Sequence, residues 1–186
     1  MTAILVFPPG SPEVSPSEMW SIQNTLLAEA ERLLGPKDPT KEIYQPTFSD
    51  KGPHTINTPS LDGAFADLSP NAARFWPTAV YELAHETVHL LNPIAGAATV
   101  LEEGVAETFA LQMGETFGGF KQSSRECYQQ ACDAVSALGS DVLEIGKMVR
   151  EKYGSLSRVK ASDLKDLFPT AASDLIEKLV AKFDRK

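Results

Sequence analysis

The spacing of apolar residues changes near residue 77. Beyond that point they recur at steps of three and four, the period of an amphipathic helix, and the first such stretch covers residues 77–91. Asn92 and Pro93 end this helix. Its apolar stripe, which we expect to face the core, consists of Val80, Leu83, Ala84, Val88 and Leu91. Further helices are predicted over residues 99–113, 123–138, 141–153, 162–167 and 171–183.

The first third of the chain carries one helix and several short strand patterns. Ser15-Pro16-Ser17-Glu18 has the pattern of a capping box with proline at the first helical position. It predicts a helix that continues to Leu34 and ends at Gly35-Pro36. Strands are predicted over residues 3–7, 42–45, 55–57 and 63–68. Strands in the first third and helices in the rest together predict an α+β fold.

The length of 186 residues lets the chain bury a core of its own, and we predict a single domain over residues 1–186. Residues 1–76 would form its sheet-rich part with one helix, and residues 77–113 the two helices that carry the candidate metal site. Residues 114–186 would form its helical part. The sequence does not indicate an oligomeric state.

Charge and cysteine content narrow the classes of partner and location. The net charge of −8 argues against a nucleic-acid partner, which needs clustered Lys and Arg. No apolar run is as long as a membrane span, and the first residues lack the basic region of a signal peptide, so we expect no membrane partner. Cys127 and Cys132 lie five apart in a predicted helix and suit neither a disulfide nor a shared metal. We therefore expect a reducing, cytoplasmic location.

Two of the three histidines lie in the stretch His85-Glu86-Thr87-Val88-His89, within the helix over residues 77–91. Residues four apart share a helix face, so both imidazoles can point to one metal ion. Zn²⁺ accepts nitrogen ligands in this arrangement. Glu86 lies beside His85 on the helix and can reach a metal-bound water without being a ligand. The spacing therefore predicts His85 and His89 as zinc ligands and Glu86 as a general base.

A catalytic zinc also needs a third protein ligand. Residues 92–96 would let the chain reverse, so that the helix over residues 99–113 returns antiparallel beside the first. Glu103 would then face the two histidines, and Glu107, one turn later, could accept a hydrogen bond from the second nitrogen of a ligand histidine. His54, the remaining histidine, follows Gly52 and Pro53 and is expected to be a residue of a surface loop.

The order His85-Glu86-x-x-His89 followed by Glu103-Gly104-x-Ala106-Glu107 resembles the gluzincin group of zinc metallopeptidases, the thermolysin-like and aminopeptidase-like clan. The resemblance covers about residues 60–113. It implies a zincin-like core with a small twisted sheet, and it implies that the strand before the active-site helix, here residues 63–68, is an edge where an extended peptide can pair. The spacing from the second histidine to Glu103 is short for this group, and no Asn precedes Glu103. Glu107 is therefore left open as an alternative third ligand, although we favour Glu103.

The resemblance implies hydrolysis of peptide bonds in a peptide or protein substrate. Zinc would polarise the scissile carbonyl, and Glu86 would take a proton from the attacking water and pass it to the leaving amine. A further donor usually stabilises the oxyanion. The candidates downstream are Tyr128, Tyr153 and Arg125, although each of them can equally be structural.

Two other interpretations remain open at this point. The chain can be a zincin-fold binding or regulatory protein that recognises a peptide without cleaving it, although the presence of Glu86 argues against this. It can also be a metal-free helical protein in which the two histidines are four residues apart by accident. Metal analysis of the purified protein separates this last interpretation from the others.

Overall fold

The helices and strands follow one another in an α+β order. The structure is a computed structural model, and it describes residues 7–119 and 124–184. Within these residues there are eight α-helices, one short 3-10 helix and four short strands, and a single hydrophobic core that joins residues from Met19 to Leu179. The predicted α+β class is confirmed.

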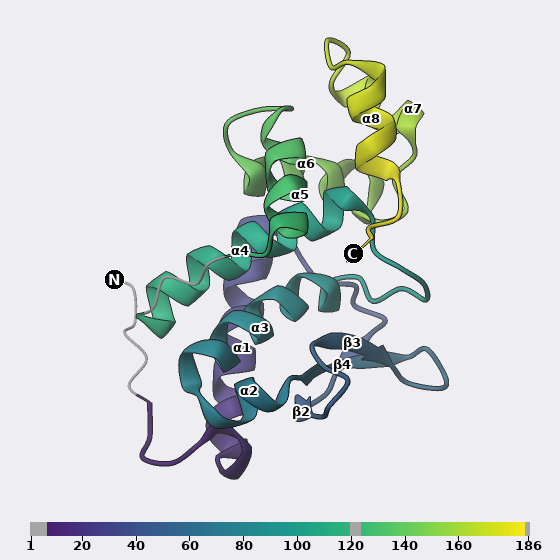
Figure 1. Cartoon of the computed structure of the whole chain (residues 1–186). Coiled ribbons are helices and arrows are strands. Elements are labelled where there is room, and N and C mark those ends of the chain that lie inside the picture. The colour runs from purple at the N-terminus through teal and green to yellow at the C-terminus, as the bar shows by residue number, and fades with distance from the viewer. Residues whose placement is uncertain (1–6, 120–123, 185–186) are drawn as a thin grey trace.

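The elements of the first half are the 3-10 helix η1 (Pro12–Val14), α1 (Pro16–Leu34), β1 (Glu42–Ile43), β2 (Thr47–Phe48), β3 (His54–Asn57), β4 (Gly63–Leu68), α2 (Pro70–Arg74) and α3 (Trp76–Leu90). Those of the second half are α4 (Val100–Gly118), α5 (Glu126–Ser136), α6 (Val142–Tyr153), α7 (Ala161–Leu167) and α8 (Ser173–Val180). In Figure 1 α3 and α4 lie side by side in the middle of the molecule, with the sheet beside α3 and helices α5–α8 beyond α4.

Helix α3 forms where the apolar spacing predicts it. All five residues of the predicted stripe are buried, from Val80 to Leu91. Pro77 occupies the first turn, where its missing N–H costs no hydrogen bond. Helix α4 is longer than predicted and ends at Gly118; the next residue, Gly119, has a φ of +61°, a left-handed conformation that favours glycine.

Several predicted boundaries and contacts are wrong. Ser15 precedes α1, but its side chain makes no capping hydrogen bond, so the predicted capping box is absent. Strand β1 is shorter than the predicted 42–45, and β2 and α2 were not predicted. Of the strand predicted over residues 3–7, only Phe7 lies within the described residues, and it is in no strand. Helix α8 ends at Val180 rather than at residue 183, because the following residues pair with the segment before α4.

The sheet is built around β4. Strands β1 and β2 pair with it in parallel, at its first and last residues, and β3 pairs antiparallel with residues 64–67. Since β3 occupies one side of β4 along its length, β1 and β2 share the other side. The prediction that residues 63–68 form an edge strand is therefore wrong, and β3 is the edge on the side of α3 that carries the candidate site.

The free backbone groups of β3 can be assigned from its hydrogen bonds. The amide of Thr58 donates to the carbonyl of Gly63, and the register then pairs residues 56 and 54 with β4 in the same way. The backbone groups of Thr55 and Asn57 consequently point away from β4. Their side chains lie on the sheet face that packs on α3, the same face as Ala64 and Ala66 of β4.

Candidate metal centre

The candidate site lies where α3 and α4 pack against each other. Helix α3 ends at Leu90, the chain reverses through residues 91–99, and Thr99 opens α4 with its hydroxyl accepting a hydrogen bond from the amide of Glu102. This N-cap places the acidic first turn of α4 opposite the last turn of α3. The reversal that the sequence predicts over residues 92–96 is therefore present, and Glu103 faces the two histidines.

Three buried side chains converge on one point. His85, His89 and Glu103 each present a ligand atom, and these atoms lie within 4.8 Å of one another. The Nε2 atom of His85 is 3.1 Å from Oε2 of Glu103, and the Nε2 atom of His89 is 3.7 Å from Oε1 of the same carboxylate. Two imidazole nitrogens and a carboxylate in this arrangement can hold a metal ion.

The outer nitrogen of His85 is fixed by a carboxylate one turn further along α4. Its Nδ1 atom is 3.3 Å from Oε2 of Glu107. The Tyr81 hydroxyl donates to the same carboxylate, at 2.8 and 2.9 Å from its two oxygens. Glu107 therefore lies on the far side of His85 from Glu103, where it orients the imidazole so that Nε2 points to the common centre.

The outer nitrogen of His89 has an equivalent partner that the sequence did not reveal. Its Nδ1 atom is 3.1 Å from Oε1 of Glu102, which is itself buried. The other oxygen of Glu102 accepts a hydrogen bond from the hydroxyl of Ser157, and that hydroxyl also accepts one from the amide of Thr99. The acidic run before Gly104 indicated a role for Glu102 only weakly, and nothing in the sequence linked it to Ser157.

The carboxylates around the two histidines determine the charge of the imidazoles. Burial lowers the pKa of His85, but hydrogen bonds with Glu103 and Glu107 and the charges of Glu103 and Glu86 outweigh it and raise this pKa to about 10. Burial likewise lowers the pKa of His89, and the charges of Glu102 and Glu103 raise it to about 9. Without a metal ion, the cluster therefore favours protonated histidines. A metal ion that binds to them must displace one proton from each ring.

Glu86 lies beside the histidines with one oxygen held and the other free of partners. Thr55 of β3 donates its hydroxyl to Oε2 at 2.9 Å. The Oε1 atom is buried and has no hydrogen-bond partner, and the same holds for Nε2 of His89. Buried polar atoms normally have partners, so two orphaned atoms at one centre indicate a site shaped for a missing group.

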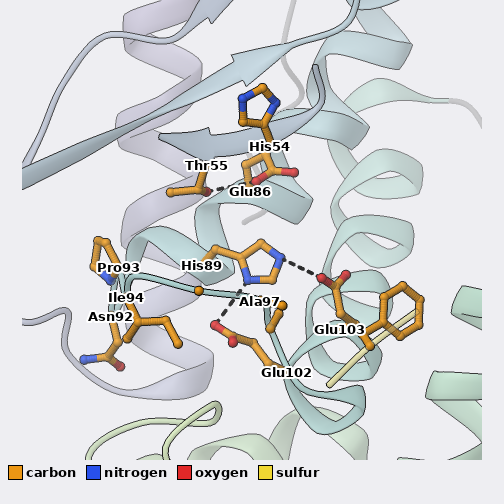
Figure 2. A pocket seen from close by; sticks show the side chains of 13 residues that line it. His54, Thr55, Glu86, His89, Asn92, Pro93, Ile94, Ala97, Glu102 and Glu103 are labelled. Atoms are coloured by element: carbon orange, nitrogen blue, oxygen red, sulfur yellow. Dashed lines mark hydrogen bonds and ion pairs between the residues drawn. The ribbon is translucent and has the colours of Figure 1, made fainter. Parts of the chain in front are cut away.

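A cavity of about 310 Å³ gives access to these atoms. Figure 2 shows His89 in its wall between the carboxylates of Glu102 and Glu103, with Thr55 and Glu86 toward β3. The residues that line it are His54, Thr55, Glu86, His89, Asn92, Pro93, Ile94, Gly96, Ala97, Ala98, Glu102, Glu103 and Phe183. His54, expected in a surface loop, begins β3 and lies at this cavity, 3.9 Å from Asp67 through its Nε2 atom.

The three candidate oxyanion donors differ in where they lie relative to the metal cluster. Tyr128 of α5 is buried and its ring contacts the ring of His85 edge-on at 5.3 Å, but it does not line the cavity. Tyr153 lies away from the cluster, because its hydroxyl donates to the carbonyl of Asp163 at the start of α7. Arg125 is exposed at the N-terminus of α5. Tyr128 therefore contacts the metal cluster through the ring of His85.

Comparison with known protein families, with curated proteins and with solved structures gives no match for this chain. No helix among the described residues is both long and apolar enough to cross a membrane. The functional conclusion therefore rests on the geometry of the site.

Proposed function

We propose that this protein is a zinc-dependent peptidase with a zincin-like fold, in which His85, His89 and Glu103 hold the metal and Glu86 is the general base. The observation that carries the proposal is the convergence of the three buried ligand atoms beside a buried glutamate oxygen that has no partner. A metal-binding cluster alone fits many functions. The added base within the same cavity favours hydrolysis.

The donor set fits zinc better than the other common divalent ions. Two imidazoles and one carboxylate form one of the three-ligand sets of catalytic zinc, whereas Mg²⁺ and Ca²⁺ prefer oxygen ligands. The Nε2 atom of His89 is buried and has no hydrogen-bond partner, as expected of a ligand atom whose partner is a metal ion. With three protein ligands, a bound zinc would keep one coordination position open for substrate or water.

Zinc, when bound, supplies a Lewis acid that polarises a carbonyl and makes a neighbouring water more acidic. The protein's own residues then handle the proton. Thr55 holds Oε2 of Glu86, which leaves Oε1 directed to accept the proton of the attacking water and to deliver it to the leaving amine. Glu103 and Glu107 hold His85 between them, and Glu102 fixes His89, so the ligand imidazoles keep their orientation while the proton moves.

The order of elements around the site supports a zincin-like fold and a peptide substrate. The helix with both histidines packs under a small sheet, and the third ligand comes from the next helix. Strand β3 lies above Glu86 as an antiparallel edge, with the backbone groups of Thr55 directed away from β4. An extended peptide can add to such an edge through main-chain hydrogen bonds. A cytoplasmic location is supported by Cys127 and Cys132, both of which are free thiols.

The test combines metal analysis with one substitution. Purified protein should contain one zinc per chain by mass spectrometry, and it should cleave members of a peptide library. Glu86→Gln should retain the zinc and lose hydrolysis, whereas Glu115→Gln, an exposed change on α4, should alter neither. A chain without stoichiometric metal, or full activity in Glu86→Gln, contradicts the proposal. Bound zinc with no cleavage of any peptide favours the alternative, a zincin-fold binding protein.

A further inference from the structure

The cavity at the metal cluster has two walls that come from different parts of the chain. One wall is β3, which contributes His54 and Thr55. The other is the α3–α4 connection, defined here as residues 92–98, which contributes six of the lining residues. This connection is short because only nine residues separate α3 from α4, so it lies against the site instead of extending away from it.

The α3–α4 connection is anchored at its beginning, middle and end. The side chain of Asn92 accepts a hydrogen bond from Nε of the buried Arg150 at 2.9 Å. The carbonyl of Ile94 accepts one from the side-chain amide of Asn57 at 3.0 Å. The carbonyl of Ala98 accepts one from the amide of Phe183, whose residue also lines the cavity. The wall is therefore fixed to the core and is not a free loop.

The bond between Asn57 and Ile94 joins the two walls directly. A peptide that lies along β3 past Thr55 meets this bond and cannot continue between the walls. Thr55 marks the position of the general base, since its hydroxyl holds Glu86. Asn57 lies two residues beyond Thr55 along the strand, a rise of about 7 Å. The space between the reacting bond and the closed end therefore holds about one or two substrate residues.

The charge of the cavity favours one end of a peptide over the other. Its lining includes the carboxylates of Glu86, Glu102 and Glu103 and, among the described residues, no Lys or Arg. A bound divalent cation with neutral histidines leaves the three carboxylates with a net charge of about −1. A peptide amino terminus, which is a cation, is attracted to such a cavity, and a carboxyl terminus is repelled.

We propose that this cavity receives the amino-terminal end of a peptide, so that the protein removes one or two residues from a free amino terminus. The proposal rests on the peptidase function above and specifies its substrate class. Water adds across the bond after the first or second residue, which yields an amino acid or dipeptide and a shortened peptide with a new amino terminus. No further reactant is needed.

The direction of β3 agrees with this orientation. Antiparallel pairing is the slightly more stable way to add a strand to an edge. The strand β3 runs from His54 to Asn57, so an antiparallel peptide has its amino end at Asn57, the closed end. Its carboxyl end leaves past His54, whose side chain is 33% exposed. Charge and strand direction thus place the same end of the substrate at the closure.

The first experiment compares matched peptides on the zinc-loaded full chain. One sequence is prepared with a free amino terminus, with an acetylated amino terminus, and with a free amino terminus and an amidated carboxyl end. We expect mass spectrometry to find one or two residues released from the amino end of both peptides with a free amino terminus. The acetylated peptide should be cleaved at least about tenfold more slowly, because it lacks the charge and is longer at the closed end.

A binding measurement gives a readout that does not depend on turnover. Zinc-loaded Glu86→Asp, which keeps the negative charge of the cavity and shortens the side chain of the base, should bind the free peptide at least about tenfold more tightly than the acetylated one by calorimetry, since a hydrogen bond to a charged group is lost with the acetylated peptide. Equal affinity for the two peptides overturns the proposal, even though the protein still holds zinc and binds peptides.

Asn57→Ala tests the closure itself. Removal of the side-chain amide separates the walls, so the preference for the free over the acetylated peptide should fall at least about fivefold, with cleavage further along the chain. Ser60→Ala is the control, because Ser60 lies at the exposed hairpin turn and bonds only with Asp62. Zinc content and melting temperature establish that both variants are folded.

The outcomes separate the two proposals. Internal cleavage of the acetylated peptide by the unmodified protein, at a rate like that of the free peptide, overturns the terminal specificity and leaves the peptidase function intact. Release of residues from the carboxyl end of the peptide likewise overturns the amino-terminal specificity and leaves the peptidase function intact. Absence of zinc, or of any hydrolysis, overturns the peptidase function. If Asn57→Ala retains zinc and still prefers the free over the acetylated peptide to the same extent, the bond between Asn57 and Ile94 is not the cause of that preference.

Discussion

The ion pair between Glu102 and His89 leads to a quantitative prediction about zinc affinity. Glu102 is buried, its Oε1 atom is 3.1 Å from Nδ1 of His89, and its other oxygen is held by Ser157. Glu102→Gln keeps the size of the side chain and removes its charge. The imidazole of His89 then becomes a weaker ligand and is less firmly oriented toward the metal.

The magnitude follows from the position of Glu102 behind a ligand. Loss of a carboxylate that supports a ligand histidine typically weakens metal binding about 10- to 100-fold, which corresponds to about 1.4–2.7 kcal/mol. Ser157→Ala should weaken binding less, about threefold to tenfold, because it removes a neutral donor one step further from the metal. Glu107→Gln, which acts on His85 through its Nδ1 atom, should match Glu102→Gln.

The assay is competition for zinc against a chelator of known affinity, with the folded fraction checked by circular dichroism. Zinc affinity within twofold of the unmodified protein in Glu102→Gln, alongside a large loss in Glu107→Gln, would refute the reasoning. That result would mean that His89 is oriented by packing alone. Equal and large losses in both variants would establish that each ligand histidine has its own carboxylate.

Three further outcomes can be measured. Thr55→Val should lower kcat about tenfold with zinc content unchanged, because Glu86 loses its donor, and Thr55→Ser should restore most of the rate in steady-state assays. Gly104→Ala should lower the free energy of unfolding by about 1–3 kcal/mol in urea denaturation, since the new methyl group meets a backbone oxygen of α5 at 2.6 Å; Gly118→Ala on the same helix has only an ordinary 3.6 Å contact and should change little. Zinc binding near neutral pH should release about two protons, because the pKa values of the ligand histidines are raised to about 10 and 9 and the metal requires neutral imidazoles. The zinc affinity should therefore rise with pH. Calorimetry in buffers of different ionisation enthalpy measures the number of protons released, and a value of zero contradicts this prediction.

The helices could be predicted from the sequence far better than the sheet. A helix is specified by residues three and four apart within one segment, so α3 and α6 appear within one residue of their predicted bounds. The position of a strand within a sheet depends on partners elsewhere in the chain. Residues 63–68 have the pattern of a strand, but nothing in that pattern shows that β1 and β2 cover one side and β3 the other.

The same distinction applies to the site. One helical turn between His85 and His89 brings their imidazoles together, and a reversing chain brings Glu103 to them, so these residues could be found by spacing. The contact between Glu102 and Ser157 joins residues 55 positions apart and depends on how α6 packs on α4 and on where the connection from α6 to α7 then lies. The contact of Tyr153 could not be found from the sequence for the same reason, because its hydroxyl donates to the carbonyl of Asp163 in α7.

The charges of the cluster explain why metal binding requires little rearrangement. With both histidines protonated, two positive charges face the four carboxylates of Glu86, Glu102, Glu103 and Glu107, and exchange of two protons for one Zn²⁺ leaves this balance unchanged. The carboxylates therefore hold the imidazoles in the same place before and after the metal binds. One defect remains without it: Nε2 of His89 is buried and lies 3.7 Å from Glu103, too far for a hydrogen bond. An unsatisfied buried donor costs about 1–3 kcal/mol, and a metal ion at the common centre removes that cost.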